Sequence, residues 1–270
     1  MSAIKVTDLW KSYGGTVILE RVDLSIRSGA FVSLVGPSGC GKSTFLRILL
    51  GQETQTRGDI TIDGAPLLAE PSVDRGVVFQ RYSVFPHLTV LGNVMLGLEL
   101  AQSPVLTRLF GQKRKQARDE AMEWVGHVGL GHAADKYPHE LSGGMQQRLA
   151  IAQAMIKKPK ILLLDEPFGA LDPGIRADMH DLIKALWAET GMTVVMVSHD
   201  LKEAFTLGTR VIAFDRTRTR PEERDAFGAT ITFDVETRTP FKAMWAPDPV
   251  TIEQMKEEMG EERWNAAIST

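Results

Sequence analysis

The sequence holds a single cysteine, Cys40, among its 270 residues. One cysteine cannot form an internal disulfide, which fits a protein of a reducing compartment. Residues 1–15 lack the apolar stretch of a secretion signal. No window approaches the roughly 18 uninterrupted apolar residues of a membrane-spanning helix. These absences lead us to expect a cytoplasmic protein that does not cross a membrane.

A strong excess of charge of either sign is missing as well. The chain has 31 Lys and Arg against 34 Asp and Glu, a net charge of −3 and a pI near 6.1. This balance provides no general basic surface, so nucleic acid is not an expected partner. Hydrophobic residues make up 43% of the chain, which is enough for a sizeable core.

The chain changes character along its length. Residues 3–35 cluster β-branched residues between turn signals and predict strands. Residues 88–158 follow a helical period, and after Pro159 strands alternate with helices, as in a parallel α/β sheet. Within 216–270, the segment 229–236 predicts a strand and 248–268 a helix, with Thr251 and Gln254 at capping-box spacing. Each of three predicted helices has an apolar face that is expected to point into the core. The first face consists of Ala117, Ala121, Val125 and Val128, the second of Met145, Leu149, Ala152 and Ile156, and the third of Met179, Leu182 and Leu186.

The stretch GPSGCGKST, residues 36–44, joins a predicted buried strand to a predicted helix and fits G-x-x-x-x-G-K-[ST]. Glycines let successive backbone N–H groups point at a phosphate, and the helix N-terminus favours an anion. Lysine adds a full charge for the outer phosphates, and the serine hydroxyl can hold Mg²⁺. A plain glycine turn is the alternative. The pattern predicts binding of ATP with Mg²⁺ by Gly36, Pro37, Ser38, Gly39, Cys40, Gly41, Lys42, Ser43 and Thr44.

Two further features concern the chemistry of this predicted site. The helix N-terminus and the neighbouring lysine are expected to lower the pKa of the Cys40 thiol.

In KILLLDEP, residues 160–167, Asp165 and Glu166 end a buried strand. Asp165 suits the outer coordination of Mg²⁺, and Glu166 suits accepting a proton from an attacking water. Alone this could be any strand with an acidic end, but beside the glycine loop it predicts hydrolysis.

LSGGMQQR, residues 141–148, completes a motif set by which the chain resembles the ATP-binding subunit of an ABC transporter. The resemblance covers residues 3–215 and implies an ATPase with an α/β fold. That fold is a P-loop NTPase (RecA-like) core with an N-terminal antiparallel β-subdomain and an inserted α-helical subdomain. The nucleotide-binding domain is expected over 1–215, with its core at 1–87 and 159–215 and its helical subdomain at 88–158. Residues 216–270 are expected to form a short C-terminal extension.

The resemblance also implies roles for single residues. Tyr13 matches the aromatic residue that stacks on adenine, although it could merely pack a strand. Gln80 matches the glutamine that contacts Mg²⁺ and the attacking water, and His199 matches the histidine near the γ-phosphate. The expected catalytic residues are thus Glu166, His199 and Gln80, and the expected Mg²⁺ residues are Ser43, Gln80 and Asp165.

A second copy of the chain is the expected partner in a head-to-tail dimer that holds two ATP molecules. The resemblance implies that Ser142, Gly143, Gly144 and Met145 close over the nucleotide of the other subunit. The D-loop, with Ala170, Leu171 and Asp172, is expected to cross the interface. Two departures from the family pattern are Gly169, where serine is frequent, and Thr209, where aspartate is usual; we expect neither to abolish catalysis.

The segments YPHELSGGMQQR (137–148) and VVFQRYSVFPHLTVLGNV (77–94) resemble importer subunits. This resemblance implies a membrane permease whose cytoplasmic coupling helix docks in a groove lined by Arg81 to Phe85. It also implies an indirect contact with a solute-binding protein and a location on the inner face of the membrane. Alternatively, Tyr82 and Phe85 only pack the helical subdomain. The stretch 220–236 is similar to the nitrate/sulfonate/taurine group. The basic run 111–118 is expected to be an exposed helix face. A soluble ABC-type ATPase of an assembly system and a P-loop kinase remain rival functions.

Overall fold

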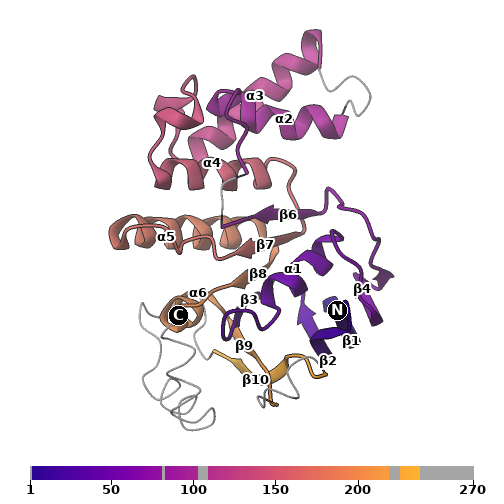
Figure 1. Cartoon of the computed structure of the whole chain (residues 1–270). Coiled ribbons are helices and arrows are strands. Elements are labelled where there is room, and N and C mark those ends of the chain that lie inside the picture. The colour runs from indigo at the N-terminus through magenta and orange to yellow at the C-terminus, as the bar shows by residue number, and fades with distance from the viewer. Residues whose placement is uncertain (1, 81–82, 103–108, 219–225, 238–270) are drawn as a thin grey trace. The chain divides into compact units, whose positions relative to one another are not determined.

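The computed structural model describes residues 2–80, 83–102, 109–218 and 226–237 (Figure 1). The described chain forms two compact units. The first unit combines residues 2–72 with the described residues from 191 onward, and the second lies between 73 and 190. The predicted helix at 248–268, including Thr251 and Gln254, lies outside the described residues.

The first unit contains an antiparallel sheet in the order β2-β1-β4-β5. Its strands are β1 (Ser2–Tyr13), β2 (Thr16–Arg27), β4 (Arg57–Ile62) and β5 (Ala65–Pro66). Along β2 buried and exposed residues alternate over the second half of the strand, as one covered face requires. The hairpin between β1 and β2 turns at Gly14 and Gly15, both with positive φ, as a two-residue turn prefers.

The same unit contains a parallel arrangement around β3 (Phe31–Val35). β3 pairs in parallel with β8 (Thr193–Val197) on one side and with β9 (Arg210–Asp215) on the other. The helices α1 (Lys42–Leu50) and α6 (Leu201–Leu207) follow β3 and β8. Every residue of β3 and β8 is buried, which explains why both strands are apolar except for Ser33 and Thr193.

The strand predicted at 229–236 is confirmed as β10 (Thr230–Glu236), which pairs antiparallel with β9. Its Phe233 and Val235 pack on a buried cluster that includes Leu201 and Phe205 of α6. Thr209, where the family usually has aspartate, is bound to the first residue of β3. Its hydroxyl Oγ1 lies 3.2 Å from the amide N of Phe31 and 3.0 Å from the Phe31 carbonyl oxygen.

The second unit joins two parallel strands, β6 (Arg75–Val78) and β7 (Ile161–Asp165), to four helices. These helices are α2 (Val90–Gln102), α3 (Gly111–His127), α4 (Gly143–Met155) and α5 (Pro173–Thr190). Short 3₁₀ turns at Gly131–Ala133 and Pro138–Glu140 lie between α3 and α4. The predicted inward face of α3 is confirmed, because Ala117, Ala121 and Val125 are buried, as is Val128 just beyond its end.

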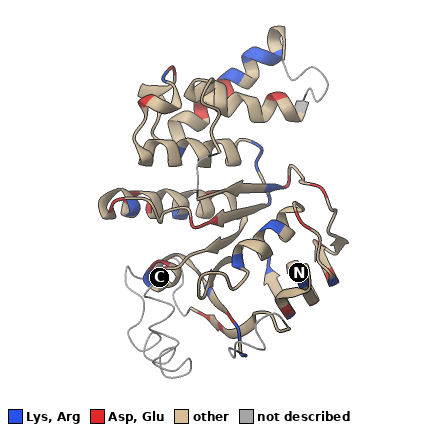
Figure 2. Cartoon of the chain, in the orientation of Figure 1, with Lys and Arg blue, Asp and Glu red and all other residues tan. Residues whose placement is uncertain are grey.

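Two helix faces differ from their prediction. In the face predicted for α4, Leu149, Ala152 and Ile156 are buried, whereas Met145 is only partly buried. In α5 the buried residues are Met179, Ile183 and Leu186, whereas Leu182 is only partly buried. The predicted exposure of the basic run 111–118 holds for Lys113, Arg114, Lys115 and Arg118, all of which are exposed, and basic residues colour the beginning of α3 in Figure 2. Within the described residues, no helix has the length and apolar character that crossing a lipid bilayer requires.

Candidate functional site

The predicted phosphate loop lies between β3 and α1, and two of its glycines lack room for a Cβ atom in the present packing. Gly36 has φ +140°, and a Cβ added there would lie 2.0 Å from the carbonyl oxygen of Phe214 in β9. Gly41 has φ +96°, and its Cβ would lie 2.7 Å from a methyl group of Leu19. Because the loop has no side chain at these points, its backbone curls closely at the start of α1, as a phosphate cradle requires.

Lys42 is the first residue of α1 and is only 6% exposed. Its Nζ donates to the carbonyl oxygens of Gly36 at 2.6 Å and Pro37 at 2.9 Å. The two carbonyls hold the ammonium group inside the turn of the loop. A full positive charge and the N-terminal amides of α1 are therefore concentrated in one small region, which suits an anion with several phosphates.

Cys40 corrects one expectation. Burial raises the pKa of its thiol, whereas a lowered pKa was predicted. Lys42 does act in the expected direction, with Nζ 3.7 Å from the Cys40 sulfur, but desolvation of the thiolate outweighs it. Cys40 is 4% exposed, so it behaves as a small packing residue of the loop rather than as an activated thiol.

His199 follows β8 at the same edge of the parallel strands as the phosphate loop. In the register of β3 and β8, Leu34 lies beside Val197, and the amide of Ser198 donates to the carbonyl of Leu34 at 3.0 Å. The chain after His199 is fixed by Asp200, whose Oδ1 accepts from the amide of Glu203 at the start of α6. The structure thus brings His199 and the phosphate loop to the carboxyl ends of neighbouring strands.

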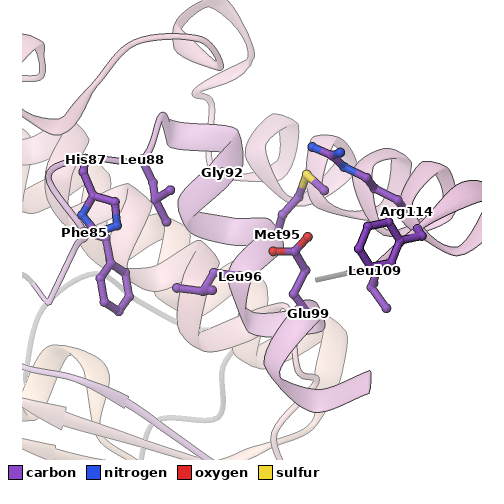
Figure 3. A pocket seen from close by; sticks show the side chains of 10 residues that line it. Phe85, His87, Leu88, Gly92, Met95, Leu96, Glu99, Leu109 and Arg114 are labelled. Atoms are coloured by element: carbon purple, nitrogen blue, oxygen red, sulfur yellow. The ribbon is translucent and has the colours of Figure 1, made fainter. Parts of the chain in front are cut away.

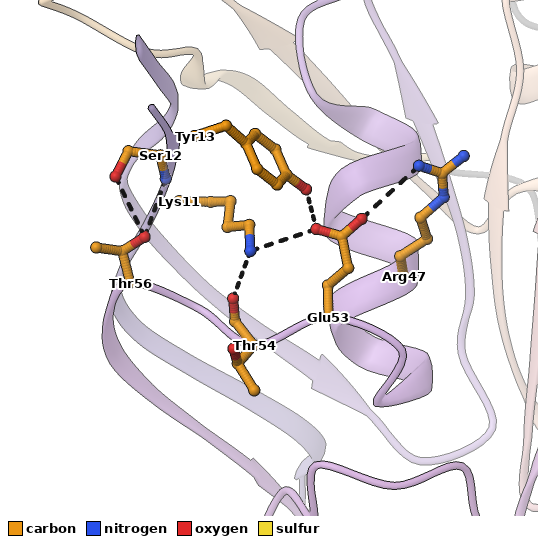
Figure 4. A network of polar contacts seen from close by, with 7 residues as sticks. All are labelled: Lys11, Ser12, Tyr13, Arg47, Glu53, Thr54 and Thr56. Atoms are coloured by element: carbon orange, nitrogen blue, oxygen red, sulfur yellow. Dashed lines mark hydrogen bonds and ion pairs between the residues drawn. The ribbon is translucent and has the colours of Figure 1, made fainter. Parts of the chain in front are cut away.

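Tyr13 ends β1, and its ring is 45% exposed. Its hydroxyl donates to a carboxylate oxygen of Glu53, and the ammonium group of Lys11 lies 4.5 Å from the ring centroid (Figure 4). The ring is therefore held by polar partners instead of being packed into the core. This geometry favours the stacking role over the alternative in which Tyr13 only packs a strand.

The second unit gathers the predicted acidic residues and Gln80 at one sheet edge. β6 and β7 run parallel with Val78 beside Leu164, so Gln80 and Asp165 both follow the carboxyl ends of these strands. Glu166, the next residue, has φ +47°. A glutamate in the left-handed region costs about 1–2 kcal/mol of conformational energy, and such strain is typical of functional positions.

The predicted signature forms the start of α4. The Ser142 hydroxyl accepts from the amide of Met145 at 3.3 Å, which caps the helix. Gly144 is buried, and a Cβ there would lie 2.5 Å from a methyl group of Ile175 in α5. Ser142 and Gly143 are exposed, so the beginning of the helix lies at the surface.

The predicted D-loop lies between β7 and α5. Leu171 is buried and anchors the loop, because its amide donates to the carbonyl of Phe168 at 3.1 Å. Ala170 and Asp172 are exposed on either side of it. The ring of Phe168 packs edge-on against His180 of α5 with 5.0 Å between centroids, which fixes the loop to the helix that follows.

A pocket of about 480 Å³ opens between α2, α3 and the segment that precedes α2 (Figure 3). Its lining includes Phe85, Leu96, Phe110, Glu99 and Arg114. The two phenylalanines are 42% and 68% exposed, respectively. Of the groove predicted at Arg81 to Phe85, Arg81 and Tyr82 lie outside the described residues.

Residue by residue, each unit therefore assembles part of the predicted site. The first holds the phosphate loop, His199 and Tyr13, and the second holds Gln80, Asp165, Glu166, the signature and the D-loop. The residues that the sequence reasoning missed are Lys11 and Glu53, which hold Tyr13. Neither belongs to a motif, and the contact of Tyr13 with Glu53 spans 40 positions of the chain, so no local signal points to it.

A comparison with known protein families shows to which family the chain belongs. A family profile described as ABC transporter matches residues 19–169. The chain belongs to the ABC transporter family. The predicted α/β P-loop NTPase fold class and the predicted ATPase activity of an ABC cassette are thereby confirmed.

Individual members of the ABC transporter family align over most of the chain. It is 42% identical over 215 residues to the aliphatic sulfonates import ATP-binding protein SsuB 2 of Agrobacterium fabrum, which covers 80% of this chain and 77% of that protein. It is 42% identical over 212 residues to the nitrate import ATP-binding protein NrtD of a Synechocystis species, with 77% and 76% covered. A solved dimeric post-hydrolysis state of the ATP-binding cassette MJ0796 bound to ADP and Pi superimposes with a TM-score of 0.70. It is 33% identical and covers 88% of this chain and 100% of that chain.

Proposed function

We propose that this chain is the ATP-hydrolysing subunit of an ABC importer and energises uptake of a small solute through a separate membrane permease. The observation that carries the proposal is the match over about three quarters of two importer ATP-binding proteins. These relatives are named for sulfonates and for nitrate, which are both small anions, and the identity to each is 42%. A spermidine/putrescine import ATP-binding protein of Pseudomonas aeruginosa, named for cations, is also 42% identical. We therefore propose only a small solute and assign its selection to the permease and a solute-binding protein.

The nucleotide site of this proposal begins at the loop between β3 and α1. Lys42 and the loop amides bind the phosphates of ATP, and the ring of Tyr13 stacks on adenine. The hydroxyl of Ser43 and the amide oxygen of Gln80 would supply oxygen donors, which are the ligands that Mg²⁺ prefers, and the carboxylate of Asp165 would act in its outer coordination. When bound, Mg²⁺ neutralises charge on the phosphate oxygens.

Hydrolysis is assigned to residues that follow the strands. Glu166 accepts the proton of the attacking water, His199 contacts the γ-phosphate, and Gln80 orients the water. The position of Glu166 directly after β7, with a left-handed backbone, is compatible with this assignment, although four other non-glycine residues of the described chain also have positive φ.

The working form in this proposal is a dimer of two copies with the signature acting across the interface. Ser142, Gly143, Gly144 and Met145 offer the N-terminus of α4 to the γ-phosphate bound by the partner copy. The exposed Ala170 and Asp172 beside the buried Leu171 contact the partner through the D-loop. The proposed division of the chain is a nucleotide-binding domain over 1–215, with a helical subdomain at 88–158, and an extension over 216–270.

Docking of the permease is assigned to the pocket between α2 and α3. Its aromatic side chains suit the apolar face of a short coupling helix, and Glu99 and Arg114 offer one charge of each sign at the rim. In this proposal the chain acts at the cytoplasmic face of the membrane, where its partner holds it. The pocket adds residues of α2 and α3 to the groove predicted at Arg81 to Phe85.

A pull-down of the tagged protein from gently solubilised native membranes tests the proposal. We expect a polytopic permease to be captured by the wild-type chain and by Leu68→Ser, which removes an equally exposed apolar side chain elsewhere. Capture should fall with Phe110→Ser, while the ATPase rate of the isolated protein stays unchanged. Recovery of soluble assembly proteins without a permease would contradict the importer function, and transfer of phosphate to a metabolite instead of water would contradict hydrolysis.

A further inference from the structure

Seven residues around the end of β1 form a polar network that no sequence motif covers (Figure 4). At its centre is the carboxylate of Glu53. One carboxylate oxygen of Glu53 accepts from the Tyr13 hydroxyl and lies 3.3 Å from Lys11 Nζ. The other oxygen lies 3.7 Å from a guanidinium nitrogen of Arg47 in α1. A single carboxylate therefore joins the exposed ring of Tyr13 to the helix that starts at the phosphate loop.

Glu53 is held in place by the end of α1. The helix stops at Gly51, which has φ +82° and lets the chain turn back on the last helical turn. The amides of Gln52 and Glu53 both donate to the carbonyl of Arg47, at 2.9 and 3.3 Å. The backbone position of Glu53 is thus set by the same nine-residue helix whose first residue is Lys42.

Lys11 occupies one side of the Tyr13 ring. Its side chain is 11% exposed, and Nζ donates to the carbonyl of Thr54 at 2.7 Å besides contacting Glu53. With Nζ 4.5 Å from the ring centroid, the ammonium group is within the range of a cation–π contact, which strengthens when the charge is partly desolvated. The Lys11 side of the ring is covered, and 45% of Tyr13 is exposed.

We propose that Lys11 and Glu53 are positioning residues for adenine: they hold the Tyr13 ring with one face against the Lys11 ammonium group and leave the opposite face for the base. This inference rests on the proposed stacking role of Tyr13. Because Glu53 follows the end of α1, its contact with Tyr13 ties the adenine platform on β1 to the helix that begins at the phosphate loop. Binding of the base then requires little further ordering of the ring, which is how preorganisation increases affinity.

The test separates the base from the phosphates. We would measure the affinities for ADP and for tripolyphosphate by calorimetry, and kcat and KM for ATP, with Lys11→Met and Glu53→Gln. Both changes keep the length of the side chain while removing its charge. We expect ADP affinity to fall by about five- to tenfold, as loss of a charge-assisted contact predicts. Tripolyphosphate affinity should not change, and KM should rise while kcat stays constant.

Three comparisons decide the result. Arg57→Gln, which breaks the 2.8 Å ion pair with Asp8 in the same sheet, should leave both affinities unchanged. If Tyr13→Ala weakens ADP binding but Lys11→Met and Glu53→Gln do not, the positioning role is wrong while adenine stacking stands. If Tyr13→Ala leaves ADP binding unchanged, the stacking role itself is wrong. An equal loss of both ligands in the Lys11 and Glu53 variants would also overturn the inference, because it would reveal a general structural role.

Discussion

At the scale of the residue, Cys40 shows two opposing effects on one thiol. The charge of Lys42 favours the thiolate, but burial favours the protonated form more strongly and raises the thiol pKa. The unfolded chain therefore loses this proton at a lower pH than the folded chain. The stabilising contribution of the protonated thiol is complete below the ordinary cysteine pKa and is lost as the pH rises through the folded value.

The rate at which Cys40 reacts with an alkylating agent therefore reports the direction of its pKa shift, because only the thiolate reacts. At pH 8 we expect iodoacetamide to modify the folded protein more slowly than the urea-unfolded chain, because less thiolate is present and the sulfur is 4% exposed. The rate should rise further as the pH is increased past the ordinary thiol pKa. Mass spectrometry over a pH series gives both curves. A folded protein that reacts faster than the unfolded chain would restore the lowered pKa that the sequence predicts.

The sign of this shift could not be predicted from the sequence. The residues flanking Cys40 are readable as a helix start and a lysine, and both lower a thiol pKa. Burial depends instead on long-range packing, such as the approach of β9 to Gly36 at the base of the loop. The same limit applies to Glu53, whose partner Tyr13 is 40 positions away in the chain. Motif residues were predictable, and the residues that hold them were not.

At the scale of the element, the junction of β3 and α1 shows that its glycines serve different purposes. Gly36 and Gly39 both have positive φ. A Cβ at Gly36 would collide with the Phe214 carbonyl at 2.0 Å, whereas a Cβ at Gly39 would meet nothing within 4 Å. Gly39 is therefore required only for its backbone conformation, and Gly36 also for the close approach of β9.

Alanine substitutions at these two positions should consequently differ in cost. We expect Gly39→Ala to lower the free energy of unfolding by about 1 kcal/mol, the cost of a left-handed alanine. Gly36→Ala should lower it by about 3 kcal/mol or more, since strand or loop must also shift. Urea denaturation followed by circular dichroism measures both values. Equal losses would mean that the loop relaxes freely away from β9.

Among the secondary-structure elements, fully buried strands are the ones that the sequence predicts most reliably. A short continuous apolar run such as 161–164, which comes after Pro159 and is followed by acidic residues, favours a buried strand by its length, and the structure has β7 there. The rotation of a helix is harder to predict. In α5 the series Met179, Leu182, Leu186 and the series Met179, Ile183, Leu186 both follow a 3.6-residue period. Packing selects Ile183 for the core, and the pattern alone cannot decide between them.

At the scale of the whole molecule, the family and its ATPase activity were predictable because three motifs, at 36–44, 141–148 and 160–167, occur together in one chain. The arrangement of the complete nucleotide site could not be predicted from these motifs. Its proposed residues come from both compact units, and the signature is proposed to act on the nucleotide of a second copy. Ser142 is well suited to testing this, since it is exposed and its hydroxyl only caps α4.

We expect Glu166→Gln to bind Mg-ATP but to hydrolyse it at least about a hundredfold more slowly than the wild type. With ATP present, this variant should elute as a dimer in size-exclusion chromatography. Adding Ser142→Asp should abolish this dimer, because aspartate keeps the helix cap but places a negative charge against the partner's γ-phosphate. ATP affinity of the monomer should not change, since its own phosphate loop is intact. Adding Lys42→Ala instead should remove both dimer and affinity. A Ser142→Asp variant that lost monomer affinity would place the signature over its own nucleotide, and one that still dimerised would remove it from the interface.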